Sequence, residues 1–188
     1  MKVKNVIISK QGETSENFSK FLDIVNGKNI NVIALNKGDK ISVEKNLYFD
    51  VLWPDNSDFI SENSLNNNAL VCKLCYKDFS CIFTGDIEEI TEKKLIKLYS
   101  NTNALSATVL KVAHHGSKSS SLEEFLKLVQ PKVALIGVGE DNLYGHPNSE
   151  VLARLARFGI KIYRTDEDGE ISIIVNHKGI FKVKSFFN

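Results

Sequence analysis

TVLKVAHHGSKSS, residues 108–120, passes directly from an apolar run into a polar, glycine-containing one. The apolar part, Thr108–Ala113, predicts a buried strand. Polar groups that follow the carboxyl end of such a strand lie where open α/β sheets usually build their sites. If the extended geometry continues, the side chains of His114 and His115 leave in opposite directions, so that one faces the site while the other supports it. A solvated histidine pair in a loop is the alternative interpretation.

A second apolar strand ends in a carboxylate. Residues Phe79–Thr84 run into Gly85, which lets backbone approach a ligand closely, and then into Asp86. The Asp86 carboxylate is a hard oxygen donor that can bridge two cations. A structural role is the alternative, because Asp86 also suits the N-cap of a helix that begins at Ile87.

A third apolar strand, Val133–Val138, is followed by a histidine held before proline, His146-Pro147. A turn that leads into the next helix is the alternative interpretation of this segment. Directly after the histidine pair and Gly116, Ser117 lies in a small turn whose hydrogen-bonding groups suit an oxyanion or a phosphate. The sequence therefore offers three strand ends that could share one site.

The remaining pattern alternates short β-branched runs with helical periodicity, which favours an α/β or α+β layer fold within one domain, residues 1–188. The helical patterns cover residues 15–25, 87–99, 119–128 and 150–158. The other strand patterns cover residues 3–9, 31–35, 47–53, 69–76, 161–165, 170–175 and 180–185. Turn signals at Lys77-Asp78, Asp168-Gly169 and Lys178-Gly179 predict hairpins. Asp55–Asn68 is a long polar loop.

Composition limits the function classes. Lys+Arg 24 against Asp+Glu 23 gives a net charge of +1, so no global positive field attracts nucleic acid, and a polyanion would need a local patch or a metal. No apolar run approaches the roughly 18 residues of a membrane helix, so the chain as given is expected to be soluble. The three cysteines predict buried apolar side chains rather than disulfides. Four histidines leave little slack for a two-metal site.

Five segments, taken in order, resemble one family. They are Asn66–Val71, Phe83–Asp86, His114–Ser120, Tyr144–Pro147 and Tyr163–Gly169. The set is similar to the metallo-β-lactamase-like domain at the carboxyl end of ComEC-type competence proteins, the DNA-uptake channel family, over residues 4–175. The resemblance implies an α+β fold, an αββα sandwich with a zinc or manganese site at one edge.

The resemblance also implies a chemistry and a role for each residue. The reaction is hydrolysis of a phosphodiester, by a nuclease that acts on incoming single-stranded DNA beside a bacterial plasma-membrane channel. Asp86 corresponds to the carboxylate metal ligand and His114 to the histidine ligand, with His115 as the fallback. Ser117 and His146 would contact phosphate or relay a proton. A metal-bound water has its pKa lowered towards neutrality and can attack phosphorus.

One departure from the family pattern is decisive. Such domains carry an early HxHxDH motif, and no histidine precedes His114 here. We therefore expect a fragment of a longer membrane protein, incomplete in its amino-terminal half, that binds catalytic metal weakly or not at all and is inactive alone. Dimerisation through the exposed truncated face is a further expectation. The alternatives are a degenerate, non-catalytic module that binds DNA or protein, and a hydrolase of small phosphodiesters such as phosphocholine esters.

Overall fold

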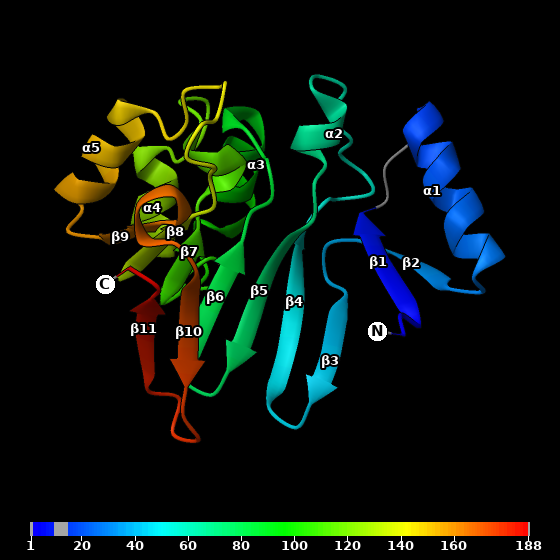
Figure 1. Ribbon diagram of the computed structural model, residues 1–188, viewed down its shortest axis with the longest axis horizontal. Helices are drawn as coiled ribbons and strands as arrows, with labels where there is room; N and C mark the ends of the chain where they lie inside the picture. Colours follow the sequence, from blue (N-terminus) through cyan, green and yellow to red (C-terminus); the bar gives the residue numbers. More distant parts are fainter. Residues whose placement is uncertain (1, 10–14, 188) are drawn as a thin grey trace.

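The computed structural model describes residues 2–9 and 15–187, and its central element is a seven-stranded sheet (Figure 1). The strands of this sheet follow the order β3 (Lys40–Glu44), β4 (Leu47–Trp53), β5 (Val71–Tyr76), β6 (Phe79–Phe83), β7 (Val109–Lys111), β8 (Val133–Ile136) and β9 (Lys161–Arg164). The helices are α1 (Glu16–Gly27), α2 (Ser64–Asn67), α3 (Glu89–Tyr99), α4 (Glu123–Val129), α5 (Ser149–Arg157) and α6 (Thr165–Asp168). A 3-10 turn spans Ala113–Gly116.

The strand directions explain where a site can form. Strands β3 to β6 are antiparallel, whereas β6, β7, β8 and β9 are parallel to one another. The loops that leave β6, β7 and β8 therefore emerge at one end of the sheet, the upper end in Figure 1. These are the loops that carry the three predicted strand-end motifs.

Alternation along the strands builds a core on each face of the sheet. Ile82 in β6 and Leu110 in β7 pack under the helices α3, α4 and α5, while their neighbours Cys81 and Val109 face the opposite side. There they meet apolar side chains of a second, two-stranded sheet, β10 (Ile171–Val175) with β11 (Phe181–Ser185). Each fully buried aliphatic side chain contributes about 1.5–3 kcal/mol. The large sheet is therefore enclosed between helices and a second sheet, as in a mixed α/β sandwich.

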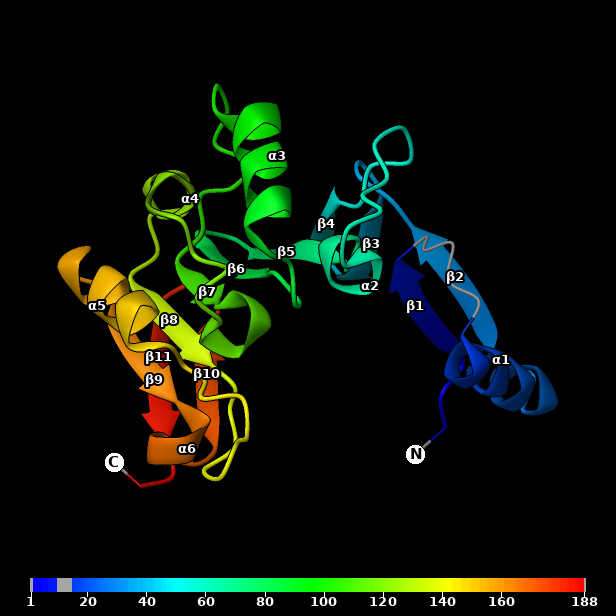
Figure 2. The same cartoon turned by 90° about the horizontal axis from the view of Figure 1, so that it is seen from above.

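The amino-terminal elements form a separate βαβ unit. Strands β1 (Asn5–Ser9) and β2 (Asn31–Leu35) are parallel and are connected through α1. Figure 2 shows this unit beside the β3–β4 end of the seven-stranded sheet, as a two-stranded sheet of its own. Ile7 lies opposite Ile33 in the strand register, and these side chains are 36% and 40% exposed. One face of the unit therefore exposes an apolar pair next to the polar pair Asn5 and Asn31.

Several local predictions are corrected by the structure. The turn signal at Asp168-Gly169 does not join β9 to β10 as a hairpin, because β9 pairs with β8 and β10 pairs with β11. Instead, Asp168 accepts a hydrogen bond from the Arg164 amide (2.7 Å) and Asp166 pairs with the Arg164 guanidinium, which curls the acidic run into α6. The hairpins at Lys77-Asp78 and Lys178-Gly179 are confirmed.

Element boundaries also differ from the predicted ones. Strand β3 was not predicted, because its apolar side chains Ile41 and Val43 are too few to mark a strand. The 119–128 helix begins only at Glu123. Helix α5 begins at Ser149, one residue before the predicted start at 150, and Asn148 caps it by accepting a hydrogen bond from the Glu150 amide.

Of the three cysteines, Cys72 and Cys81 are buried as predicted, and Cys75 is half-buried. Within the described residues, every helix is too short or too polar to cross a lipid bilayer.

Candidate functional site

Backbone contacts join the three strand-end loops. The His114 amide donates to the Gly85 carbonyl (3.0 Å), and the Asn148 amide donates to the Gly116 carbonyl (2.9 Å). Gly116 has φ +82°, and a Cβ there would lie 2.7 Å from Cβ of Pro147. Only glycine permits this approach, because any side chain would push the loops apart. The loops that carry the five predicted site residues are thus fastened to one another.

The histidine pair does not continue the strand. His114 (φ 47°, ψ 44°) and His115 (φ 54°, ψ 22°) both lie in the left-handed region, inside the 3-10 turn. The expectation of alternating side chains on an extended chain is therefore wrong in its geometry. Left-handed backbone at residues other than glycine is costly and is found mainly where surrounding contacts enforce it, often at functional sites.

His115 is the member of the pair that approaches Asp86. Its Nε2 lies 3.7 Å from Asp86 Oδ1, and its Nδ1 lies 2.5 Å from the Gly137 carbonyl oxygen. His115 and Asp86 are both about half exposed, so their polar atoms remain accessible to a ligand. The His115 side chain, which follows β7, therefore contacts residues that follow both β6 and β8.

His114 approaches a different carboxylate, Glu88, which the sequence did not single out. Its Nδ1 is buried and has no hydrogen-bond partner among the described residues, although Glu88 Oε1 lies 3.5 Å away. Glu88 is itself held, because Asn63 Nδ2 donates to Oε2 (3.0 Å) and Asn67 Oδ1 accepts from the Glu88 amide (3.1 Å). A carboxylate behind a histidine is the usual arrangement for orienting an imidazole that binds a metal.

His146 completes the cluster from the third loop. Its ring meets the His114 ring edge-on, with centroids 5.7 Å apart. Burial lowers the pKa of His146, positive charge on His114 and His115 lowers it further, and Asp86 acts in the opposite direction. The four predicted groups Asp86, His114, His115 and His146 therefore lie within electrostatic reach of one another.

Asp86 does not serve as a helix cap. Helix α3 begins at Glu89, and its N-cap residue is Glu88, without a capping side-chain hydrogen bond. This geometry removes the structural alternative for Asp86. Lys111, at the end of β7, is a neighbour of the site: burial lowers its pKa, and Asp86 partly offsets that shift. The Lys111 Nζ atom donates to the Val112 carbonyl (2.8 Å), which holds this side chain at the end of β7.

Ser117 is engaged within its own loop. Its hydroxyl lies 3.0 Å from the Ser119 hydroxyl and accepts a 3.4 Å hydrogen bond from the Ser119 amide. Ser120 is buried, and its hydroxyl donates to the carbonyls of Ala113 (3.1 Å) and Ser117 (2.9 Å). The serines that follow the histidine pair therefore fix the shape of the loop.

A buried carboxylate anchors the far end of the same loop. Glu92 of α3 is fully buried and accepts backbone hydrogen bonds from Ser121 (2.6 Å) and Leu122 (2.7 Å). Arg154 of α5 donates to the carbonyls of Ser120 (3.1 Å) and Ser121 (2.8 Å). Burial raises the pKa of Glu92 to about 7, against the two amide donors and Arg154. The loop is thus clamped from two helices.

Two asparagines of the segment Asn66–Val71, which is the first of the five that resemble the family, have structural roles. Asn67 and Asn68 are both fully buried. The Asn67 carbonyl accepts from the Trp53 indole (2.8 Å), and Asn68 exchanges hydrogen bonds with both backbone groups of Ile60. They hold the polar loop 55–68 against β4 and α3, and so place Asn63 beside Glu88.

The donor types at this edge suit zinc or manganese, which accept imidazole and carboxylate ligands. The buried Nδ1 atom of His114 has no hydrogen-bond partner among the described residues. Even so, no three His, Cys, Asp or Glu side chains among residues 2–9 and 15–187 converge on a position for one ion. The donor types of the described residues nevertheless suit such a metal.

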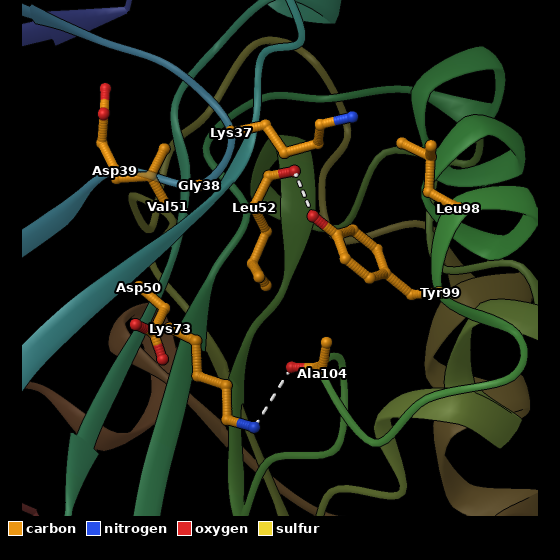
Figure 3. A pocket seen from close by; sticks show the side chains of 10 residues that line it. All are labelled: Lys37, Gly38, Asp39, Asp50, Val51, Leu52, Lys73, Leu98, Tyr99 and Ala104. Atoms are coloured by element: carbon orange, nitrogen blue, oxygen red, sulfur yellow. Dashed lines mark hydrogen bonds between the residues drawn. The ribbon is translucent and has the colours of Figure 1, made fainter.

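A separate pocket of about 460 Å³ lies between β4, β5 and the end of α3 (Figure 3). None of the five predicted site residues lines it. Its charged groups already have partners: Lys73 donates to the Ala104 carbonyl (3.1 Å), Asp50 pairs with Lys40 (3.2 Å) and Lys37 pairs with Asp55. This pocket therefore lies apart from the loop cluster, which remains the candidate site.

Sequence reasoning missed Glu88 and Glu92. Both lie in an acidic helix start whose ordinary explanation is the helix dipole. Their contacts reach His114 and Ser121, more than 20 residues away, and no local pattern signals such a contact. Among the unpredicted residues near the site, Lys111 is the one that the sequence marks, because it is a charged residue inside an apolar strand.

Comparison with known proteins finds relatives that are named for competence and recombination. No family model matches the chain. It is 37% identical over 183 residues to ComE operon protein 3 of Bacillus subtilis, a match that covers 97% of this chain and 23% of that protein. It is 31% identical to competence protein ComA of Neisseria gonorrhoeae (70% of this chain, 18% of that protein) and 30% identical to recombination protein 2 of Haemophilus influenzae (68% and 15%).

Among solved structures, a metal-dependent hydrolase from Parabacteroides distasonis superposes with a TM-score of 0.51 at 14% identity, over 86% of this chain and 64% of that one. This likeness shows a shared fold, which is the metallo-β-lactamase-like fold expected from the sequence. The chain spans less than a quarter of the length of the curated relatives it matches. The sequence match over nearly the whole chain shows that it is homologous to one part of the ComEC-type competence proteins.

Proposed function

We propose that the loop cluster is one part of a metal-dependent phosphodiesterase centre that cleaves DNA during uptake. The observation that carries the proposal is the gathering of Asp86, His114, His115 and His146 at one sheet edge, in a chain related to competence proteins. The remaining metal ligands would come from protein outside the described residues. A metal bound here would supply an activated water as the nucleophile.

The chain's own residues have distinct tasks in this proposal. Asp86 and His114 are the ligands, and Glu88 orients His114 from behind. His115 lies beside Asp86, where it can flank the metal or replace His114 as the ligand. Ser117 and His146 contact the phosphate or hold a proton at the leaving oxygen. The clamp formed by Glu92 and Arg154 keeps these groups in place.

The proposed substrate is single-stranded DNA, and the proposed partner is a membrane channel portion of the same bacterial protein. The exposed pair Ile7 and Ile33 of the β1–β2 unit is where we propose that a further part of the domain, or a second copy of the chain, packs. A non-catalytic module that binds DNA or protein is the second candidate. The lack of three converging ligands among the described residues favours it.

A cleavage assay on the full-length gene product tests the proposal. With manganese or zinc present, we expect cleavage of single-stranded DNA that a chelator abolishes, because the reaction needs the metal-activated water. A chromogenic phosphocholine ester serves as the small phosphodiester in a parallel reaction and should not be turned over. Preferential cleavage of the ester would identify a small-molecule hydrolase, and binding of DNA without any cleavage would favour the non-catalytic module.

A further inference from the structure

The loop between β8 and α5 carries an unusual tip. Leu143 is 98% exposed and Tyr144 is 84% exposed, and these are the most exposed large apolar side chains of the described residues. The tip lies only two residues before His146, which belongs to the loop cluster. Exposed apolar groups at the rim of a polar site are typical of contacts with a ligand.

The tip is held in place rather than free. Asn142 clamps the loop, because its Nδ2 donates to the His146 carbonyl (2.7 Å) and its Oδ1 accepts from the His146 amide (2.9 Å). The Tyr144 ring lies nearly parallel to the His146 ring, at 17° and with centroids 6.1 Å apart. A series of rings therefore runs from His114 through His146 to Tyr144, from the site out to solvent.

The charged residues around the tip indicate which class of ligand Leu143 and Tyr144 can bind. Glu140 and Asp141 are exposed and precede the tip, so this loop offers no attraction to a phosphate group. What Leu143 and Tyr144 offer is a flat ring with an apolar neighbour. Nucleobases bind such rings by stacking, independently of sequence. A trimethylammonium group is usually enclosed by several rings, and Tyr144 is the only exposed ring on this loop.

We propose that Tyr144, flanked by Leu143, is a stacking platform for a nucleobase of the strand whose phosphodiester lies at the loop cluster. This inference rests on the proposed function and adds to it a residue that selects nucleic acid over small phosphodiesters. Tyr144 is a substrate-binding residue here, since it contacts the base and not the reacting phosphate.

Fluorescence anisotropy with an end-labelled thymidine oligonucleotide, and with an abasic oligonucleotide of the same length, tests the platform on the chain without metal. For Tyr144→Ala we expect affinity for the thymidine strand to fall about 5- to 150-fold, the usual loss when one stacking aromatic is removed. The abasic strand should bind both proteins equally, and Tyr144→Phe should restore wild-type affinity because it keeps the ring. Ile180→Ala, an exposed apolar change in the β10–β11 hairpin, is the matched control.

Salt adds a second readout. Stacking releases no counterions, so Tyr144→Ala should leave the slope of log affinity against log salt unchanged between about 50 and 200 mM. An equal loss on the abasic strand, or no loss on the thymidine strand, would overturn the platform while leaving the nuclease proposal intact. If the wild-type chain binds neither strand, this inference fails, whereas metal-dependent cleavage by the full-length gene product separately decides the proposed function.

Discussion

Substituting Asp86 with alanine should lower metal-dependent DNA cleavage by the full-length gene product on the order of a thousandfold, or about 4 kcal/mol of transition-state stabilisation. Asp86 is the only carboxylate that the structure places beside His115 at the strand ends, among the residues described. It is not needed as a helix cap, because α3 begins at Glu89. The loss should therefore appear in turnover rather than in folding.

Asp78→Ala is the matched control for this substitution. Asp78 is an exposed aspartate in the β5–β6 turn, outside the loop cluster. Its removal should leave cleavage unchanged, and thermal unfolding of both variants should match that of the wild type. Cleavage by Asp86→Ala at the wild-type rate would remove Asp86 from the site.

Glu92→Ala should destabilise the chain by roughly 2–5 kcal/mol, the range expected when buried amide donors lose their carboxyl acceptor. The substitution leaves the amides of Ser121 and Leu122 without their acceptor in the core, next to the loop that carries the histidine pair. Urea unfolding followed by circular dichroism measures the change. Glu89→Ala, on the exposed side of the same helix, should cost less than about 1 kcal/mol. Equal unfolding midpoints for the two variants would contradict the clamp.

The pH dependence of stability gives an independent check on Glu92. Its pKa rises from 4.5 to about 7 on folding, so the folded state holds the proton to higher pH than the unfolded state does. The stabilisation that this shift contributes is complete below about pH 4.5 and is lost as the pH rises through about 7. The free energy of unfolding of the wild type should therefore fall more steeply with rising pH over this window than that of Glu92→Gln, which has no titrating group at this position. Parallel curves would mean that the carboxyl does not titrate there.

The sequence could predict where the three polar loops lie, because the end of each of three strands is visible in it. The runs before Asp86, His114 and His146 are apolar, and each stops at glycine or histidine. Because the three strands pair in parallel, the residues that follow them lie at one edge of the sheet. The hairpins at Lys77-Asp78 and Lys178-Gly179 were equally local in origin. Where structure and prediction agree, short-range chemistry determines the result.

The remaining features depend on contacts between distant residues. The left-handed backbone of His114 and His115 is imposed by the hydrogen bond from His114 to Gly85 and by the approach of Gly116 to Pro147. Glu92 is buried only because residues 121–122 fold over it. No periodicity in α3 signals that contact, since its sequence presents Glu92 as one more polar helix residue.

Calorimetric titration with manganese or zinc tests the central claim most directly, because that claim is that this chain holds only part of a metal site. We expect the 188-residue chain to show no sub-micromolar site, since two or three ligands leave the coordination shell open, and the full-length gene product to show one. The site in the full-length product should weaken in Asp86→Ala. A sub-micromolar site in the 188-residue chain alone would contradict the account.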